Sequence, residues 1–284
     1  MSVALPTATT PAYGTTSCVV SKTSGVVAGD VNLFVIGCKG TSNSSGGTVA
    51  TPSGLVLQGS ILRQGGWSGT IAPDDGNTSL YAFTRDIVGG EPSTYTFVGS
   101  TMNVMWGYSA RLTKTLDLWD YGISTGARST AGTDGGSWTA SGTTNPDVDN
   151  GDCFLGIFCS PSNASDGLNW TSETLTIPGV TNAAATELAE PNTNLGNALG
   201  GVILGRLTST GPSSGNPTMT GTTVKGIKQR GAVMFIRIRD LETPDNGGDM
   251  MQFFGPMHND DELARRRSGL WAPKERELIV CKAA

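Results

Sequence analysis

Two runs of apolar residues dominate the hydrophobic pattern of the chain. They cover Val31 to Cys38 (VNLFVIGC) and Cys153 to Cys159 (CFLGIFC). Each run is apolar at both odd and even positions, so we expect strands that lie between two layers. Shorter β-branched or alternating segments predict further strands at 17–22, 55–60, 80–86, 93–99, 104–112, 168–178, 201–208, 218–224 and 231–239.

The predicted strands recur in the same order in the second half of the chain. Gly29-Asp30 opens the first apolar run, and Gly151-Asp152 opens the second run 122 positions later. Other matched segments are Leu80–Arg85 with Val202–Leu207, Glu91–Phe97 with Asn216–Thr220, and Met105–Leu112 with Ala232–Ile238. Because order and spacing agree together, we interpret the pattern as an internal repeat. Chance similarity between strands rich in Gly and Thr is the alternative.

These segments predict an all-β fold. Neither half has more than about five predicted strands, too few to cover both of its own faces. Two similar halves that face each other can form one sandwich of two sheets. We therefore expect an antiparallel β-sandwich of the jelly-roll type over residues 1–240, built from halves at about 17–118 and 140–240. Residues 118–150 are expected to form a long polar connection.

The composition changes after Asp240, where charged residues become dense. Asn259 and Glu262 have the spacing of a helix capping box, so a short helix is expected there, and residues 277–281 (ELIVC) predict a final strand. Residues 241–284 are too few to form a core of their own. We predict an assembly arm that docks on the sandwich or on a neighbouring subunit. Its candidate interface residues are Phe253, Phe254, Leu270, Trp271, Leu278 and Ile279.

Charge and hydropathy limit the possible partners. The net charge is −5, and the only basic cluster is Arg265-Arg266-Arg267, so nucleic acid is not expected as a partner. No stretch approaches the ~20 apolar residues of a membrane span. The first residues lack the basic and apolar regions of a secretory signal.

The five cysteines give no disulfide or zinc pattern. They are Cys18, Cys38, Cys153, Cys159 and Cys281, an odd number that lies mostly in apolar strands. We predict buried, reduced thiols made in a cytosol, with a Cys18–Cys38 disulfide as the alternative. No cofactor or metal is expected: Asp147, Asp149 and Asp152 only loosely resemble a calcium loop, and solvated carboxylates are the simpler interpretation.

The chain offers little for catalysis. Its one histidine, His258, lies outside the predicted sandwich, and no serine stands in a nucleophile-elbow motif. We predict that the protein is not an enzyme. The tryptophans beside polar loops could stack on sugars, form a protein interface or pack against the sandwich: Trp67, Trp119, Trp138 and Trp170.

Four motifs follow one another in the first half: Gly29-Asp30 before an apolar strand, the turn Thr51-Pro52-Ser53-Gly54 before Leu55, the strand Leu80–Arg85, and Gly89-Gly90-Glu91-Pro92 leading to Tyr95 and Phe97. In this order they resemble a family of bacteriophage virion proteins, often minor tail proteins. The resemblance covers residues 25–240 and is best in the first half. Leu55 stands where the family usually has Trp, and the segment after Asp240 is not covered. The resemblance carries over no catalytic residue.

The resemblance implies a structural protein of the virion, made in the cytoplasm of a bacterial host. We expect a tail-fibre or baseplate-associated component that forms homo-oligomers and contacts other virion proteins. A capsid decoration protein and a module that binds a host-surface glycan are the alternatives.

Overall fold

A computed structural model describes residues 5–41, 46–64, 77–113, 118–128, 137–161, 170–181, 184–193, 195, 199–223 and 231–241. Within these residues it contains strands and no helix, so the predicted all-β class is confirmed. The strands are β1 (Thr7–Ala8), β2 (Ala12–Gly14), β3 (Ser17–Ser21), β4 (Val31–Gly40), β5 (Thr48–Val49), β6 (Val56–Gln64), β7 (Thr78–Asp86), β8 (Thr94–Ser100), β9 (Met102–Leu112), β10 (Leu118–Arg128), β11 (Ser137–Ser141), β12 (Cys153–Pro161), β13 (Trp170–Thr176), β14 (Thr186–Ala189), β15 (Asn192–Thr193), β16 (Leu199–Leu207), β17 (Thr218–Thr223) and β18 (Gly231–Leu241).

These strands form two large sheets and two small sheets, and every pairing is antiparallel as predicted. The first large sheet has the order β1-β9-β4-β7-β6, and β2 also pairs with β9. The second large sheet has the order β10-β18-β12-β16-β14, and β15 also pairs with β16. The first small sheet is β3-β8-β5, and the second small sheet is β11-β17-β13.

Each half of the chain supplies one large and one small sheet with the same strand order. The apolar strands β4 and β12 hold the same central place in their large sheets. The edge strand β6 corresponds to β14 and β15 together, and β1 with β2 corresponds to β10. The two segments before the predicted halves, β1–β2 and β10, therefore complete the two large sheets.

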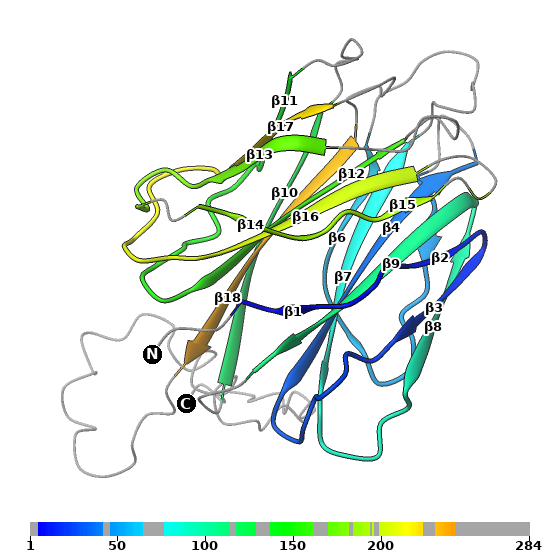
Figure 1. Ribbon diagram of the computed structural model, residues 1–284. Coiled ribbons are helices and arrows are strands. Elements are labelled where there is room, and N and C mark those ends of the chain that lie inside the picture. The colour runs from blue at the N-terminus through cyan, green and yellow to red at the C-terminus, as the bar shows by residue number, and fades with distance from the viewer. Residues whose placement is uncertain are drawn as a thin grey trace, which may run out of the picture.

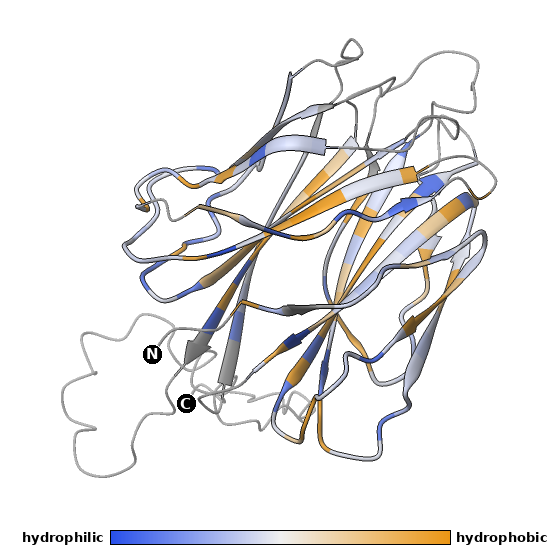
Figure 2. Ribbon diagram, in the orientation of Figure 1, coloured by the Kyte–Doolittle hydropathy of each residue, from blue (hydrophilic) through white to orange (hydrophobic). Residues whose placement is uncertain are grey.

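Three hydrophobic cores order the four sheets into four layers (Figure 1). One core fills the space between the two large sheets, and each of the others lies between a large sheet and its own small sheet. The large sheets are thus covered on both faces. All residues of β4 and β12 are buried, which confirms the prediction that these strands lie between two layers. Figure 2 shows the apolar residues gathered on the strands of the large sheets.

The layering differs from the predicted sandwich of two sheets. The two halves do face each other through their large sheets, but each half also covers the outer face of its own large sheet. Strands that were expected in one sandwich of two sheets form a separate outer sheet in each half, β3-β8-β5 and β11-β17-β13. Residues 118–150, expected to be a connection, contain β10 and β11. Only every second residue of β11 is buried, and the outward residues Ser137, Thr139 and Ser141 give this strand its polar appearance in the sequence.

Several contacts between the two large sheets occur in reciprocal pairs, although that of β6 with β18 has no equally extensive counterpart. Strand β7 contacts β18, and its counterpart β16 contacts β9, the counterpart of β18. In the same way β6 contacts β10, and β14 contacts β1. Reciprocal contacts are what a two-fold axis produces between two equal surfaces. The halves therefore pack like the subunits of a symmetric dimer within one chain.

Trp106 is the largest side chain at this interface. It lies on β9 opposite Gly37 of β4 and is fully buried. A Cβ atom added at Gly37 would lie 2.3 Å from Cε2 of the indole, and one added at Gly201 of the other half would lie 2.8 Å from Cζ2. The indole therefore fills space that two glycines, one from each half, leave open.

In each half a second core lies between the large sheet and the small sheet. Equivalent residue pairs in these two cores hold large and small side chains in opposite places. In the first small sheet Cys18 lies opposite Phe97. At the equivalent pair of the second small sheet Trp138 lies opposite Gly221, and a Cβ at Gly221 would lie 2.7 Å from the indole nitrogen. The strands are equivalent although the residues that fill the core are not, which explains why this part of the repeat is weak in the sequence.

The described part of the chain holds no candidate for a membrane-spanning helix. The predicted capping-box helix near Asn259, the predicted strand at 277–281 and the whole arm lie outside the described residues.

Candidate functional site

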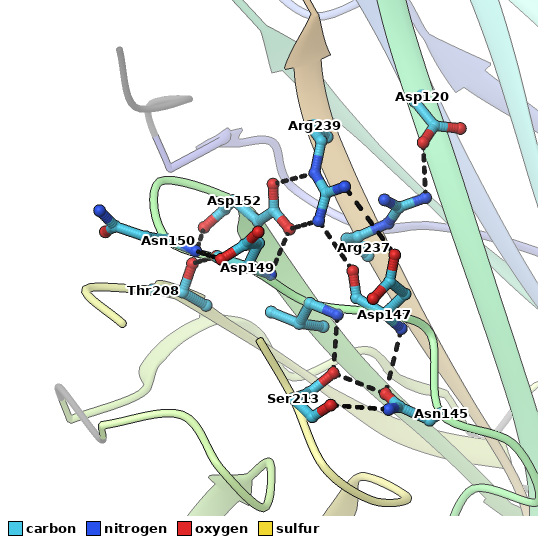
Figure 3. A network of polar contacts seen from close by, with 11 residues as sticks. Asp120, Asn145, Asp147, Asp149, Asn150, Asp152, Thr208, Ser213, Arg237 and Arg239 are labelled. Carbon is cyan, nitrogen blue, oxygen red and sulfur yellow. Dashed lines mark hydrogen bonds and ion pairs between the residues drawn. The ribbon is translucent and has the colours of Figure 1, made fainter. Parts of the chain in front are cut away.

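The acidic loop before β12 forms a network of polar contacts with the neighbouring strands (Figure 3). Gly151, at φ +85°, lets the chain turn sharply before Asp152 enters the strand. The Asp152 carboxylate accepts a hydrogen bond from the backbone N–H of Asp149 (2.7 Å), and the carboxylate is almost fully buried. The hydroxyl of Thr208 donates to the carbonyl oxygens of Asp149 and Asp152. The loop is thus fixed to the end of β16.

Arg239 of β18 lies among the carboxylates of this loop (Figure 3). Its Nε and Nη2 donate to the two carboxylate oxygens of Asp152, at 2.9 Å each, and Nη2 also donates to the carbonyl oxygen of Asp147 (2.8 Å). The hydrogen bonds to Asp152 raise the pKa of Arg239 against the opposing effect of burial, and the charges of Asp152, Asp147 and Asp149 raise it further. The positive charge that faces the carboxylates of this loop is therefore the guanidinium of Arg239.

The first half contains the same turn, and its aspartate also pairs with an arginine of the neighbouring strand, although this residue, Arg111, is equivalent in register to Arg237 rather than to Arg239. Gly29, at φ +94°, precedes Asp30, whose carboxylate accepts from the N–H of Val27 (2.8 Å) and pairs with Nε of Arg111 (2.7 Å). The backbone bonds are also repeated. The N–H of Gly29 donates to Ile87 O as that of Gly151 donates to Thr208 O. The Gly-Asp motif of the sequence is thus a turn that joins the start of one strand to the end of another.

These contacts indicate that the acidic loop stabilises the fold. Within the described ranges no group of three His, Cys, Asp or Glu side chains is arranged to hold a metal ion. The loop also differs from a solvated carboxylate cluster, because Asp152 is buried and paired while Asp147 remains mostly exposed, at 75% of its side chain. Sequence reasoning found the carboxylates and missed Arg239, which is 87 residues from its partner Asp152.

The ion pair predicts a measurable difference between neighbouring aspartates. We expect Asp152→Asn to lower the free energy of unfolding by about 1.5–3 kcal/mol, the range for hydrogen bonds to charged groups, because it leaves Arg239 without its bidentate partner. Asp147→Asn is the matched control and should change stability little, since its 4.0 Å pair is exposed. Urea unfolding of the two variants measures the difference. Equal losses would contradict the assignment of the ion pair to Asp152.

A repeated arginine holds a second turn in each half. Nη1 of Arg85 donates to the carbonyl oxygen of Gly54 (2.7 Å) in the Pro52-Ser53-Gly54 turn. In the second half Nη1 and Nη2 of Arg206 donate to the carbonyl oxygens of Leu175 (2.8 Å) and Thr181 (2.9 Å). Both arginines stand at the same position of equivalent strands, β7 and β16. They stabilise turns rather than present charge to a ligand.

The four described cysteines are buried and free, so the Cys18–Cys38 disulfide is not formed. Burial raises the pKa of Cys18 and of Cys153 to about 12, and it raises the pKa of Cys38 and Cys159 above the usual thiol range. Thiols of this kind are almost entirely protonated at neutral pH and react slowly. Cys281 lies outside the described residues.

Thiol titration follows directly from this burial. We expect the folded protein at pH 7.5 to react rapidly with an aromatic disulfide reagent at no more than one thiol, that of Cys281. All five cysteines of the chain should react once the protein is unfolded in denaturant. Removing Cys281 by substitution with Ser should abolish the rapid phase. Two or more rapidly reacting thiols in the folded protein would contradict the buried positions.

Two of the four candidate tryptophans belong to the interior. Trp138 is 1% exposed and stacks on Phe158 with ring centroids 4.3 Å apart, and Trp170 is 4% exposed and meets Trp138 edge-on at 5.4 Å. Both pack in the core of the second half. They are therefore excluded as a stacking platform for sugars. Trp67 and the side chain of Trp119 lie outside the described residues.

The outer face of the second small sheet carries a regular set of hydroxyl side chains that sequence reasoning did not single out. Three aligned rows run across the strands β11, β17 and β13: Ser137, Thr222 and Thr171; Thr139, Thr220 and Thr174; Ser141, Thr218 and Thr176. Neighbours in the rows bond to each other, as Thr174 does with Thr220 (2.6 Å). The alternation of Thr and Ser with Trp138, Ala140 and Met219 along the strands was the available signal.

Exposed apolar side chains are concentrated in the first half. Of the nine large hydrophobic residues exposed among the described residues, only Leu195 belongs to the second half. The other eight are Tyr13, Val19, Val27, Val56, Leu57, Leu62, Val88 and Val98. The outer face of the first small sheet has Val19 and Val98 where the second has only hydroxyls. Because the two halves share one architecture, the fold does not require these apolar positions.

His258 and the six predicted interface residues of the arm lie outside the described residues: Phe253, Phe254, Leu270, Trp271, Leu278 and Ile279. The structure therefore brings none of them into a described site.

Comparison of the chain with protein-family models, with curated protein sequences and with solved structures gives no match. The resemblance to phage virion proteins remains a prediction from the sequence.

Proposed function

We propose that the chain is a structural protein of a bacteriophage virion. Its place is the tail, as a fibre or baseplate-associated component that acts through contacts with other virion proteins. The observation that carries the proposal is the sequence resemblance of the first half, together with the roles that its motif residues have in the fold.

The motif residues of the resemblance stabilise turns and cores. Asp30 closes the Gly-Asp turn, and Gly54 receives the hydrogen bond of Arg85. Glu91 accepts from the N–H groups of Val88 (2.6 Å) and Gly89 (3.0 Å), and these bonds lower its pKa. A pattern that specifies a scaffold in this way supports a structural role.

Each half is proposed to be a jelly-roll-type sandwich. Consecutive strands of the first half pass back and forth between the small sheet and the large sheet, from β3 to β4, then to β5 and then to β6. The second half repeats the path through β11, β12, β13 and β14. Alternation between two sheets is the property that distinguishes jelly rolls from simple meanders.

The exposed apolar residues of the first half support binding to other proteins. Val19 and Val98 are both more than half exposed on a sheet face without charged residues, and Val27 and Val88 are exposed in the turns at one end of the same half. Such surfaces are typical of protein interfaces. Burial of Trp138 and Trp170 weakens the glycan-binding alternative, because these residues cannot stack on a sugar. No described residue favours the capsid alternative.

The proposal predicts that the arm is needed for assembly. A chain that ends after Leu241 retains every described strand, so we expect it still to fold into the four sheets. It should not be incorporated when it is supplied to a phage that lacks the gene, because it lacks Phe253, Phe254, Leu270 and Trp271. The measurements are circular dichroism of the purified protein and immunoblotting of purified particles.

His258→Ala in the full chain is the matched control, and it should be incorporated normally. Immunogold labelling of complemented particles distinguishes the stations. We expect gold label on the tails. Label on the heads would contradict the tail position and support the capsid alternative. Normal incorporation of the truncated chain would remove the assembly role of the arm.

A further inference from the structure

Strand β6 has the features of a sheet edge that binds another strand. Within the described part of the chain it ends the first large sheet and pairs only with β7. It is nine residues long, and Val56 and Leu57 at its start are 58% and 45% exposed. The edge is apolar mainly at this start, because Gln58, Ser60, Arg63 and Gln64 follow in the strand. An exposed apolar edge of this kind promotes aggregation unless something covers it.

The equivalent edge of the second half is protected. There the single strand is replaced by β14 and β15, of four and two residues. Pro191, which has no N–H group, separates them, and Glu187 is exposed. Short strands, proline and charge are the usual means of blocking an edge. The fold therefore does not require a long strand with exposed apolar residues at this place.

The C-terminal segment of the chain starts close to this edge. Strands β10 and β18 pack against β6, and a Cβ at Gly59 would lie 3.0 Å from Cγ2 of Ile123 on β10. Ile123 pairs with Ile236 of β18, and five residues later the described chain ends at Leu241. This is about 17 Å at the rise of a β-strand. The 35 residues from 242 to 276 are enough to span this distance.

We infer that residues 277–281 (ELIVC) of the same chain dock on β6 along Val56 to Ser60 and extend the first large sheet by one strand. Backbone hydrogen bonds to the edge supply binding, and apolar side chains of the added strand cover Val56 and Leu57. The segment combines β-branched and apolar residues without proline or glycine. This assigns Leu278 and Ile279 to the sandwich and leaves Phe253, Phe254, Leu270 and Trp271 for other proteins. The inference does not depend on the proposed virion role.

Disulfide trapping in the full chain tests the docking, with native Cys281 as one partner. Val56→Cys, Leu57→Cys and Ser60→Cys are made singly, because the register is not fixed in advance. Val19→Cys and Val98→Cys are the controls, since both positions are about as exposed as Val56 but lie on the first small sheet. A disulfide needs Cα atoms within about 7 Å, so only a docked segment forms it efficiently. The four buried cysteines do not compete.

We expect mild oxidation to give a monomeric disulfide with Cys281 at one or two of the β6 positions, at least tenfold faster than at the controls, with peptide mapping to identify it. Disulfide-linked dimers at the same positions would mean that the arm of another copy occupies the edge. Equal rates at β6 and control positions would contradict the docking altogether. As a second measurement, Ile279→Asp in the unmodified chain should accelerate hydrogen exchange of the β6 amides and leave that of β3 unchanged. Unchanged exchange of the β6 amides would also contradict the docking.

Discussion

Trp106→Ala should destabilise the protein by about 3–5 kcal/mol, the range for removing a buried aromatic side chain without refilling the space. The indole is fully buried between Gly37 of its own half and Gly201 of the other half, and neither glycine has a side chain that could fill the cavity. The loss should appear in one unfolding transition, because the residue belongs to the core that both halves share. Chemical denaturation followed by tryptophan fluorescence and circular dichroism measures it.

A double-mutant cycle with Gly37→Ala makes this prediction specific. Alone, Gly37→Ala places a methyl group against the indole and should cost about 1–3 kcal/mol by overpacking. In the Trp106→Ala background the same change should cost nothing or stabilise the protein. Gly156→Ala is the matched control, because its methyl group would meet Leu175 and Met219 instead. Its cost should be equal in both backgrounds, and additivity of Gly37→Ala with Trp106→Ala would contradict the packing.

Trp138→Cys should also cost about 3–5 kcal/mol, because it removes an aromatic residue that stacks on Phe158 and meets Trp170 edge-on. Gly221→Phe alone should destabilise the protein as well, since the new ring would collide with Trp138. Together the two substitutions recreate the Cys18–Phe97 pair of the first half at the equivalent place. The double variant should therefore be more stable than either single variant. A double variant that loses the sum of the two costs would show that the inner cores of the halves are not interchangeable.

Part of the fold could be predicted from the sequence. The strands β4 and β12 could be identified because every residue in them is buried, which leaves an uninterrupted apolar run. The turns before them could be identified because glycine at positive φ and a carboxylate acceptor are both required there. Each of these signals is local in the sequence.

The remaining features depend on residues far apart in the chain. The ion pair of Asp152 and Arg239 joins residues on two strands, and nothing near Arg239 in the sequence marks its role. The burial of Trp138 depends on Gly221 at the opposite position of β17. Strand β11 was missed because its alternating apolar residues lie in a long polar segment. The outer layers were missed because the sequence does not show which of the predicted strands pair with one another. All three features depend on which strands pair, and this cannot be read from the sequence.

The four-layer arrangement is consistent with the proposed structural role, because it presents two different outer surfaces. Two equivalent modules that share one core form a rigid body, and its two outer small sheets face away from each other (Figure 1). One outer face carries exposed valines and the other carries hydroxyls. A duplicated module with two different outer faces suits a protein that connects two different neighbours in an assembly.

Quantitative mass spectrometry of density-purified particles tests the virion role most directly. Isotope-labelled peptides of this chain and of the major capsid protein give the number of copies per particle. We predict a fixed number that stays constant through successive purification steps and salt washes, as expected for a built-in component. Absence of the chain from infectious particles, or a number that falls with each wash, would contradict the proposal that it is a structural protein of the virion.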